Sequence, residues 1–499
     1  MRVQIVLRCA AGSLAALTVV LLLRAAVAMA YPTDGYEKTG IRRLEWQWEA
    51  DHGVHHGRKD LPGAQWPSDR ILLNMLKEGH DFQLTTDTPK DPELQKGLED
   101  ILKRYAFRRY NVAILDITDP AQPRFAGVHE TDEMTPGSVA KLLVGAGLMK
   151  QLKDRFPDDI GKREQLLKDV KITADDWSVS DPHEVPFIYG DKGEGILYRP
   201  VRIGDTFTLW EWLDHTLSES NNSAASLVWR ETMLMKLLGP DYPPAKWDDE
   251  LFKRWDIDQM TDAAFQVVDQ PQAEAGLSSD TFNVHLFFTA HANHYIHSKA
   301  ATATPLALIQ WMVRMEQGGI VDEYSSLELK KMLYLTKRRV RYAYAEELND
   351  CGVWFKSGSL YICTPEIRPC PQYQGDVINI LNGLVEVETP VVPEPPELFG
   401  PPSSLAPAAT DSVVTAAAAP APSGAAVSPA AAPVATPAAT PATNPPLTPA
   451  KPVPLAPGVA KDGKRHVYFV AVMSNELRRN AAADHAVLAS QIHRLLVGK

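Results

Sequence analysis

The spacing of apolar and polar positions changes along the chain, and it predicts where helices and strands lie. Apolar residues recur near every third or fourth position across residues 91–107, which is typical of an amphipathic helix. Short apolar runs bounded by turn residues at 111–117 and 124–128 predict two strands. From about residue 136 to residue 345 the pattern is mostly helical.

Strand-like patterns return near the end of the chain, at residues 353–362, 376–387 and 466–473, and a last helix fits residues 483–496. The order is therefore strands, then helices, then strands and a helix. This order predicts an α+β fold in which an antiparallel sheet is built from both ends of the chain and a helical subdomain from its middle.

A proline- and alanine-rich segment, residues 390–459, interrupts this pattern, and Asp411 is its only charge between Glu397 and Lys451. Such a composition cannot bury a core, so we expect an extended, disordered insertion. Only about forty residues follow it, which is too few for an ordinary independent core. We therefore interpret the segment as a long loop at the tip of a hairpin, inside one domain formed by residues 91–389 and 460–499, rather than as a boundary between two domains.

The first thirty residues are typical of a signal peptide. Arg2 and Arg8 precede an apolar run at residues 10–23, and Ala28-Met29-Ala30 offers a cleavage site of small residues. The run is about fourteen residues long, shorter than the roughly twenty that a membrane helix needs. We expect export to a bacterial periplasm, with an uncleaved inner-membrane anchor as the alternative, followed by an N-terminal extension at residues 31–90.

Charge argues against some partners. The formal net charge is −11, and removal of the three arginines in residues 1–30 makes it −14 (−11 − 3). Such an acidic protein is a poor candidate for binding nucleic acid or anionic membranes.

Three cysteines follow the leader: Cys351, Cys363 and Cys370. Cys351 and Cys363 flank a predicted strand, and twelve extended residues span roughly 40 Å, which puts these two at opposite ends. A disulfide between Cys363 and Cys370 could clamp the turn after that strand in an oxidising compartment. Three buried thiols without a bond are the alternative.

Histidines gather at two places, residues 52–56 and residues 285–297. Neither group has the cysteines or the second cluster that would favour a metal site. We expect solvated or structural roles for these histidines and no metal, with metal binding as the alternative.

A serine and a lysine stand one helical turn apart, as Ser138 and Lys141. Thr135 suits the cap of a helix and Pro136 its first position, so both side chains are expected on one face. A serine hydroxyl becomes an effective nucleophile when a neighbouring base takes its proton. Burial and the positive end of the helix dipole would lower the pKa of Lys141 far enough for this. An ordinary helix start with an exposed lysine is the alternative.

A second motif, Ser220-Asn221-Asn222, stands between two helical runs. A loop there could point Ser220 into a cleft, where its hydroxyl relays a proton to the leaving group. Asn222 could donate its amide to a substrate carbonyl. A polar helix cap is the alternative.

A third motif, Lys356-Ser357-Gly358, lies in a strand pattern with small residues at its centre. Small residues in a strand indicate close approach of another backbone or a ligand, so a substrate peptide could add along this edge. Lys356 and Ser357 would hold its carboxylate, and the backbone N–H groups of Ser138 and Ser359 would form an oxyanion hole. A plain edge strand is the alternative.

Together and in this order, the three motifs resemble those of the class A β-lactamase and penicillin-binding-protein-like family of serine hydrolases. The resemblance covers residues 91–389 and 460–499, and Thr304-Pro305, which opens a predicted helix before the third motif, supports it. It implies the β-lactamase/transpeptidase-like fold and an acyl-enzyme on Ser138 that opens a β-lactam amide without metal or organic cofactor.

The same resemblance implies a role for each matching residue. Ser138 is the nucleophile, Lys141 its base and Ser220 the proton relay, while Asn222, Lys356, Ser357, Gly358 and Ser359 bind substrate. The partner would be a β-lactam or a D-Ala-D-Ala-type peptide, and the Pro/Ala-rich loop could contact the cell wall.

The chain departs from the family in the loop that carries the water-activating glutamate. The family's usual gap after the second motif leads to Asp256, and Met260 replaces an asparagine that helps to hold the water. The shorter arm of Asp256 could misplace the base by about an ångström, enough to cost roughly a hundredfold. We predict Asp256 as the deacylation base. The alternative functions are a D-alanyl-D-alanine carboxypeptidase or related cell-wall amidase, and a non-catalytic binding module.

Overall fold

The computed structural model describes residues 61–498 apart from 65, 67–69, 179–180, 190–194, 336–338, 363–377, 391–463 and 478–479. The chain divides into two units, Pro393–Ala456 and the remainder, and every described residue belongs to the remainder. The leader, most of the Pro/Ala-rich segment, the histidines at 52–56, Cys363 and Cys370 lie outside the described residues, so the expectations about them stay predictions.

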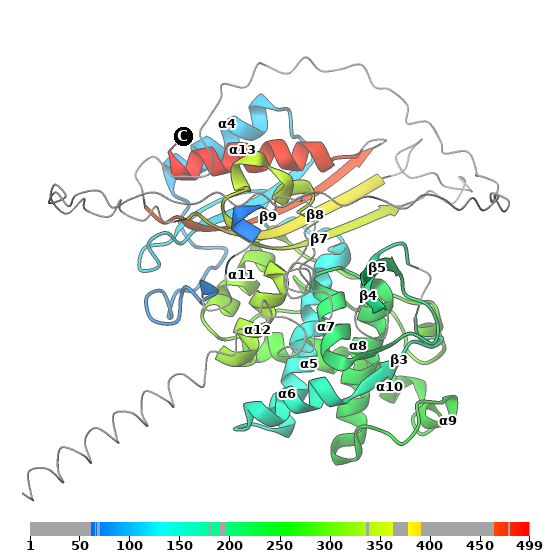
Figure 1. The fold of residues 1–499 in the computed structure, drawn as a ribbon. Helices are drawn as coiled ribbons and strands as arrows, with labels where there is room; N and C mark the ends of the chain where they lie inside the picture. The colour runs from blue at the N-terminus through cyan, green and yellow to red at the C-terminus, as the bar shows by residue number, and fades with distance from the viewer. Residues whose placement is uncertain are drawn as a thin grey trace, which may run out of the picture. The chain divides into compact units, whose positions relative to one another are not determined.

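The larger unit is built on a five-stranded antiparallel sheet (Figure 1). Its order is β2-β1-β9-β8-β7, and the strands are β1 (Tyr110–Asp116), β2 (Arg124–Val128), β7 (Gly352–Ile362), β8 (Ile378–Glu388) and β9 (Val467–Leu477). Strands from the two ends of the chain therefore pair in one sheet, which confirms the predicted α+β fold. β7 is an edge strand.

Strands β8 and β9 are neighbours, with Glu388 opposite Val467. Thr389 and His466 continue the pairing, because the Thr389 N–H donates to the His466 carbonyl at 2.9 Å. Residues 389–466 thus connect two adjacent antiparallel strands. The interpretation of residues 390–459 as a disordered insertion stays a prediction.

Both faces of the sheet are covered, and this explains the nearly continuous apolar sequence of β1. Val112 and Ile114 pack on one face with α4 (Pro92–Arg104) and α13 (Ala482–Val497), which lie together in Figure 1. Ala113 and Leu115 belong to the core on the other face, beneath the helical subdomain. Successive strand residues point to opposite faces, so a strand buried on both sides needs apolar residues at every position.

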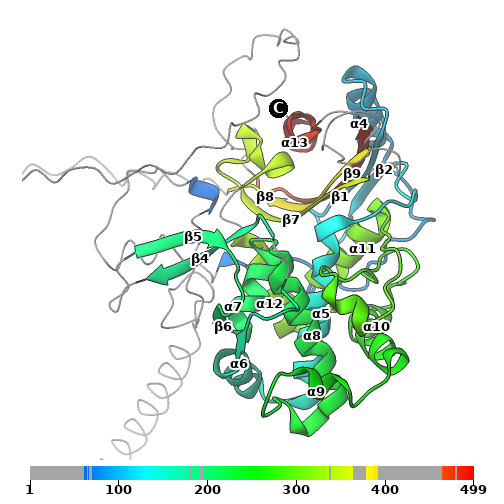
Figure 2. The same cartoon turned by 90° about the vertical axis from the view of Figure 1, so that its right-hand side faces the viewer.

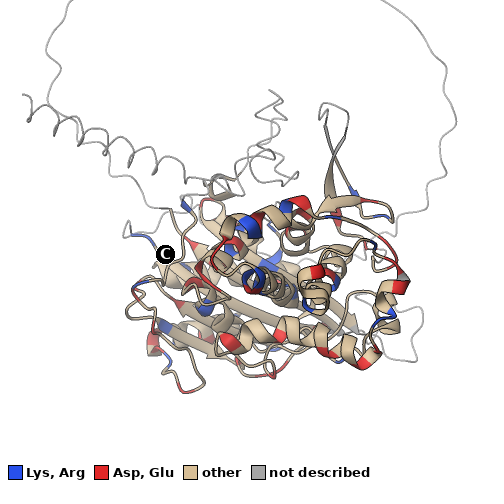
Figure 3. Cartoon of the chain, turned by 90° about the horizontal axis from the view of Figure 1, so that it is seen from below, with Lys and Arg blue, Asp and Glu red and all other residues tan. Residues whose placement is uncertain are grey.

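The remaining α-helices form the helical subdomain (Figures 1 and 2). They are α5 (Lys141–Arg155), α6 (Ile160–Asp169), α7 (Leu209–Leu217), α8 (Asn222–Leu238), α9 (Asp249–Phe252), α10 (Ile257–Glu274), α11 (Pro305–Glu316) and α12 (Glu323–Tyr334). Residues 141–152 of α5 are all buried, as expected for a helix at the centre of a bundle. Figure 3 shows basic and acidic residues interspersed over the side of the molecule that it presents.

The region predicted as mostly helical also contains short strands that the sequence analysis did not predict. It contains two small sheets, one of β3 (Lys171–Thr173) with β6 (Thr206–Thr208) and one of β4 (Glu184–Tyr189) with β5 (Gly195–Pro200). β3 and β6, with three residues each, are too short for a period to be recognised.

The first motif does not begin a helix capped by Thr135. The chain instead enters a 3-10 turn, η3 (Gly137–Ala140), whose N-terminal flanking residue Pro136 makes no side-chain cap, and the α-helix starts at Lys141. Among the described residues, no helix is both long and apolar enough to cross a membrane.

Candidate active site

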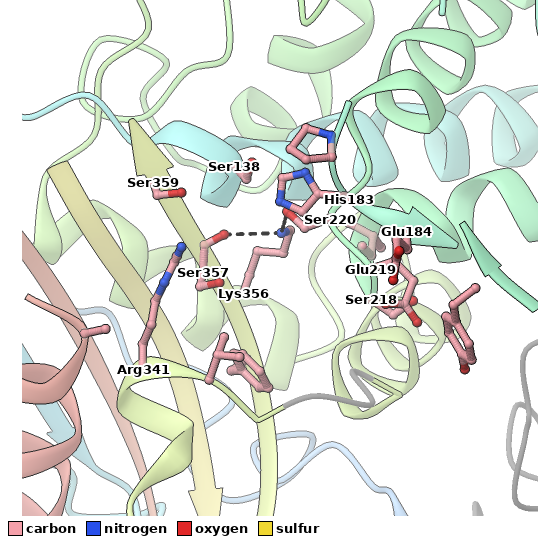
Figure 4. A pocket seen from close by; sticks show the side chains of 16 residues that line it. Ser138, His183, Glu184, Ser218, Glu219, Ser220, Arg341, Lys356, Ser357 and Ser359 are labelled. Atoms are coloured by element: carbon pink, nitrogen blue, oxygen red, sulfur yellow. Dashed lines mark hydrogen bonds between the residues drawn. The ribbon is translucent and has the colours of Figure 1, made fainter. Parts of the chain in front are cut away.

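A cavity of about 600 Å³ lies where the edge strand β7 meets η3, the turn before α8 and the strand β4. Figure 4 shows the side chains around it. The lining residues with polar side chains are Ser138, His183, Glu184, Tyr198, Ser218, Glu219, Ser220, Arg341, Lys356, Ser357 and Ser359. One cavity therefore receives residues from all three sequence motifs.

Lys141 is the first residue of α5, and its side chain is completely buried. Its Nζ donates to the carbonyl of Ser220 at 2.5 Å and to Oδ1 of Asn222 at 2.6 Å. Burial lowers the pKa of Lys141 to about 7, against a smaller opposing effect of the negative Asp181. A lysine with this pKa is partly neutral at physiological pH, so it can accept a proton.

Ser138 lies in η3, one turn before Lys141, at the wall of the cavity. Within the part of the chain that the structure describes, its hydroxyl is not hydrogen-bonded to Lys141, whose ammonium is turned toward the second motif. Hydrogen bonds of catalytic groups are often formed only when substrate is present. Ser138 and Lys141 therefore lie in one site, but in the part of the chain that the structure describes their side chains are not hydrogen-bonded to each other.

Ser220 connects the two buried lysines of the site. Its carbonyl accepts from Lys141, and its hydroxyl accepts from Nζ of Lys356 at 2.6 Å. Its backbone has a φ of +60°, a left-handed conformation that is uncommon for a residue other than glycine. This conformation turns the carbonyl and the hydroxyl toward different lysines, which an ordinary helix cap does not require.

Lys356 points from β7 into the cavity and is almost fully buried. Burial lowers its pKa well below the ordinary value, and the positive charges of Lys141 and Arg341 lower it further. Arg341 lies in η6 (Arg341–Tyr344) and donates from Nη1 to the Gly358 carbonyl at 3.0 Å. The cavity wall therefore gathers basic groups where a carboxylate can bind.

Gly358 lets β7 approach the nucleophile's turn. A Cβ at Gly358 would lie 2.3 Å from the Pro136 carbonyl oxygen and 3.0 Å from the Ser138 nitrogen. A Cβ at Gly137, where φ is +56°, would lie 3.2 Å from the Ser359 nitrogen. Two glycines thus bring the backbone nitrogens of Ser138 and Ser359 into one region, the arrangement that an oxyanion hole requires.

The family model described as the beta-lactamase enzyme family matches residues 93–377, more than half of the chain. The chain belongs to the beta-lactamase enzyme family. The match includes the three motifs and every lining residue of the cavity described above except Ala482. No curated protein matches the sequence.

Several solved structures resemble this one at low sequence identity. A class A beta-lactamase representative from Bacteroides cellulosilyticus DSM 14838 is 12% identical, with a TM-score of 0.43 over 81% of this chain and 98% of that one. A beta-lactamase from Chitinophaga pinensis DSM 2588 is 14% identical, with a TM-score of 0.41 over 80% and 98%. PBP-A is 11% identical, with a TM-score of 0.42 over 82% and 97%.

Asp256 is not in the cavity of this beta-lactamase-family protein. It is exposed and caps α10, because its carboxylate accepts from the Gln259 N–H at 2.8 Å while the Gln259 side chain returns to the Asp256 N–H. Its sequence spacing is that of a capping box, which serves the helix. The structure therefore does not bring Asp256 together with Ser138, and we do not assign it the deacylation step.

Asn222 is brought into the site, but with a different contact from the one expected. Its side-chain oxygen accepts from Lys141, and its backbone N–H donates to Asp181. Among the site residues that the sequence analysis missed in this beta-lactamase-family protein are Asp181, His183 and Arg341. No spacing pattern marks them, because each comes from a loop or turn that only the folded chain places at the cavity.

The histidines of the 285–297 region lie outside the cavity. His285 stacks on Phe265, and its Nε2 lies 2.8 Å from the Asp269 carboxylate. Among the described residues of this beta-lactamase-family protein, no three histidine, cysteine or acidic side chains are grouped so that they could hold a metal ion.

Proposed function

We propose that this chain is a serine hydrolase that opens β-lactam rings through an acyl-enzyme on Ser138. The observation that carries the proposal is the fully buried Lys141, with a pKa of about 7, one turn after a serine that lines the cavity. A lysine that is neutral near physiological pH has a chemical use beside a serine nucleophile, whereas a structural helix start has no need of it.

Acylation then follows from the residues in place. Lys141 accepts the Ser138 proton, and the serine oxygen attacks the lactam carbonyl while the N–H groups of Ser138 and Ser359 stabilise the developing oxyanion. Ser220, between Lys141 and Lys356, passes a proton to the lactam nitrogen as the C–N bond breaks. The substrate carboxylate binds at Lys356 and Ser357, and its negative charge would raise the lowered pKa of Lys356 again.

The experiment is intact-protein mass spectrometry of residues 31–499 mixed with a penicillin, beside the Ser138→Ala variant, sampled over time. An adduct that appears in the parent protein and disappears as penicillin is consumed supports a β-lactamase. No adduct on a folded parent protein would overturn the proposal and favour a binding module.

A D-alanyl-D-alanine carboxypeptidase or related cell-wall amidase is the second candidate. The position of Asp256 favours it, because the carboxylate expected to release a penicilloyl group caps a helix outside the cavity. In the same experiment a persistent penicillin adduct, lost in Ser138→Ala, would support this candidate.

Either activity fits a protein exported to the periplasm, and we retain that localisation as part of the proposal. It rests on the sequence of the leader. N-terminal sequencing of the mature protein tests it, because cleavage after Ala30 would leave Tyr31 as the first residue. A contact between the Pro/Ala-rich segment and the cell wall is the companion proposal, and sedimentation with isolated walls, with and without that segment, tests it.

A further inference from the structure

Asp181 and His183 form a pair at the cavity. The Asp181 side chain is completely buried, whereas the His183 side chain is 42% exposed and lines the cavity. His183 Nδ1 lies 2.5 Å from Oδ1 of Asp181, and the His183 backbone N–H donates to the same oxygen at 3.0 Å. The other ring nitrogen, Nε2, is not hydrogen-bonded to any residue in the described ranges.

Asp181 is itself fixed to the second motif. Its Oδ2 accepts from the Asn222 N–H at the start of α8, and the Asn221 side chain donates to the His183 carbonyl at 2.9 Å. Burial would raise the pKa of Asp181, but its hydrogen bonds with His183 and with the Asn222 N–H contribute to holding it below the ordinary value. An ionised carboxylate that is itself hydrogen-bonded to the backbone therefore orients the imidazole.

A carboxylate at Nδ1 selects one tautomer of histidine. It keeps the proton on Nδ1 and leaves the lone pair on Nε2, which makes that nitrogen the basic atom. In the view of Figure 4 the imidazole lies over the Ser138 and Ser220 side of the cavity, whereas Glu184 and Glu219 are drawn beyond Ser220. His183 is thus a carboxylate-oriented imidazole that lines the same cavity as Ser138 and Ser220.

We propose that His183 is the general base that activates water for deacylation, with Asp181 as its positioning residue; this inference rests on the proposed function. Water attacks the carbonyl carbon of the Ser138 ester, and its proton passes to His183 Nε2 as the C–O bond forms. The tetrahedral intermediate collapses, the bond from carbon to Ser138 Oγ breaks, and His183 returns the proton to Oγ. The products are the free serine and a carboxylic acid, so atoms and charge balance.

The test separates acylation from deacylation. Penicillin adducts of the parent protein, His183→Gln, His183→Ala and the control His297→Gln are followed by quenched-flow mass spectrometry. His297 is a matched control because it is also an exposed histidine, and it does not line the cavity. We expect both His183 variants to deacylate roughly 10²–10⁴-fold more slowly, with acylation changed less than about threefold. Added imidazole should restore deacylation to His183→Ala and to none of the other variants.

The positioning role of Asp181 has a spectroscopic readout. In protein labelled with ¹⁵N at histidine, the His183 shifts should report a proton on Nδ1 in the parent and a mixture of tautomers in Asp181→Asn. A purely structural Asp181 would leave the tautomer unchanged in a folded variant.

Three results would count against the inference, and they are distinguishable. Unchanged deacylation in a folded His183→Gln protein would overturn it while leaving the acyl-enzyme intact. A persistent adduct in the parent that neither His183 variant alters would also overturn it. Absence of any adduct in the parent would overturn both this inference and the proposed function.

Discussion

Gly358 of β7 lies so close to Pro136 that no side chain fits between them, since an added Cβ would stand 2.3 Å from the Pro136 carbonyl oxygen. Pro136 precedes the turn that carries Ser138, so this contact fixes the distance between the nucleophile and the edge strand. The contact joins Gly358 of the third motif to Pro136, which directly precedes the turn of the first motif and lies 222 residues earlier in the sequence.

We expect Gly358→Ala to push β7 away from the nucleophile's turn. A displacement of about 1 Å at a reacting centre can cost roughly a hundredfold in rate. The acylation rate with a chromogenic cephalosporin should fall by about that factor. Gly383→Ala is the control, because Gly383 of β8 pairs with Ser357 of β7 and its added Cβ would have its nearest contact at an ordinary 3.8 Å. Equal rates in the two variants would show that the close approach does not set the site.

The lowered pKa of Lys141 determines whether the acylation rate rises or falls as the pH increases. Its pKa is lowered to about 7 by burial, so the neutral amine that accepts the Ser138 proton accumulates as pH rises through 7. The acylation rate should therefore increase with pH across that region and fall below it. Single-turnover acylation measured between about pH 5 and pH 9 checks this.

The matched variant for that profile is Lys141→Arg, which keeps the positive charge but does not give up a proton in this range. We expect acylation to be slower by roughly 10²–10⁴-fold, with no rise near pH 7. A profile like that of the parent protein would assign the ionisation to another group.

Lys330 lies in a buried cluster of charged side chains, so we expect its substitution to lower the free energy of unfolding strongly. Lys330 is fully buried and donates to Glu386 of β8 and to the carbonyl of Leu72, and it pairs with Glu316 of α11, each at 2.7 Å. Lys330→Met would leave two buried carboxylates without their cation, which costs about 3–5 kcal/mol in the free energy of unfolding. Denaturant titration measures this loss.

The control for that measurement is Lys96→Met, which removes the partner of Asp100 from an exposed pair on α4. Exposed ion pairs contribute little, so we expect no measurable change in stability. Similar losses in both variants would mean that burial does not govern the strength of these pairs.

Deletion of residues 395–455 should leave acylation unchanged. The deletion shortens the connection between Glu388 and Val467 from 78 residues to 17 (78 − 61), while the two paired strands stay intact. A shorter loop costs less closure entropy, so we expect a gain of about 1 kcal/mol in the free energy of unfolding. Loss of the cooperative unfolding transition on deletion would show that the segment is part of the folded domain.

The position of Asp256 at the start of α10 shows why its spacing alone does not identify a catalytic role. A carboxylate at a helix start has the same appearance in the sequence whether it faces a cavity or caps the helix. Here the Gln259 side chain completes a capping box, and that local use is the one that the structure records. The helices and strands with clear periods, such as α4 and β1, were predicted to within a few residues because burial of one face or both dictates their spacing.

By itself, the sequence determined the α+β order of elements, the pairing of strands from both chain ends, and the three motifs that mark the cavity. These features depend on how apolar residues repeat along one helix or strand, and on motif residues that stand within one helical turn or one strand of each other. Only the tertiary structure decided that Lys141 is completely buried, and that a buried Asp181 holds His183 at the cavity. Burial and the meeting of loops depend on contacts between distant segments, and no local pattern of residues encodes them.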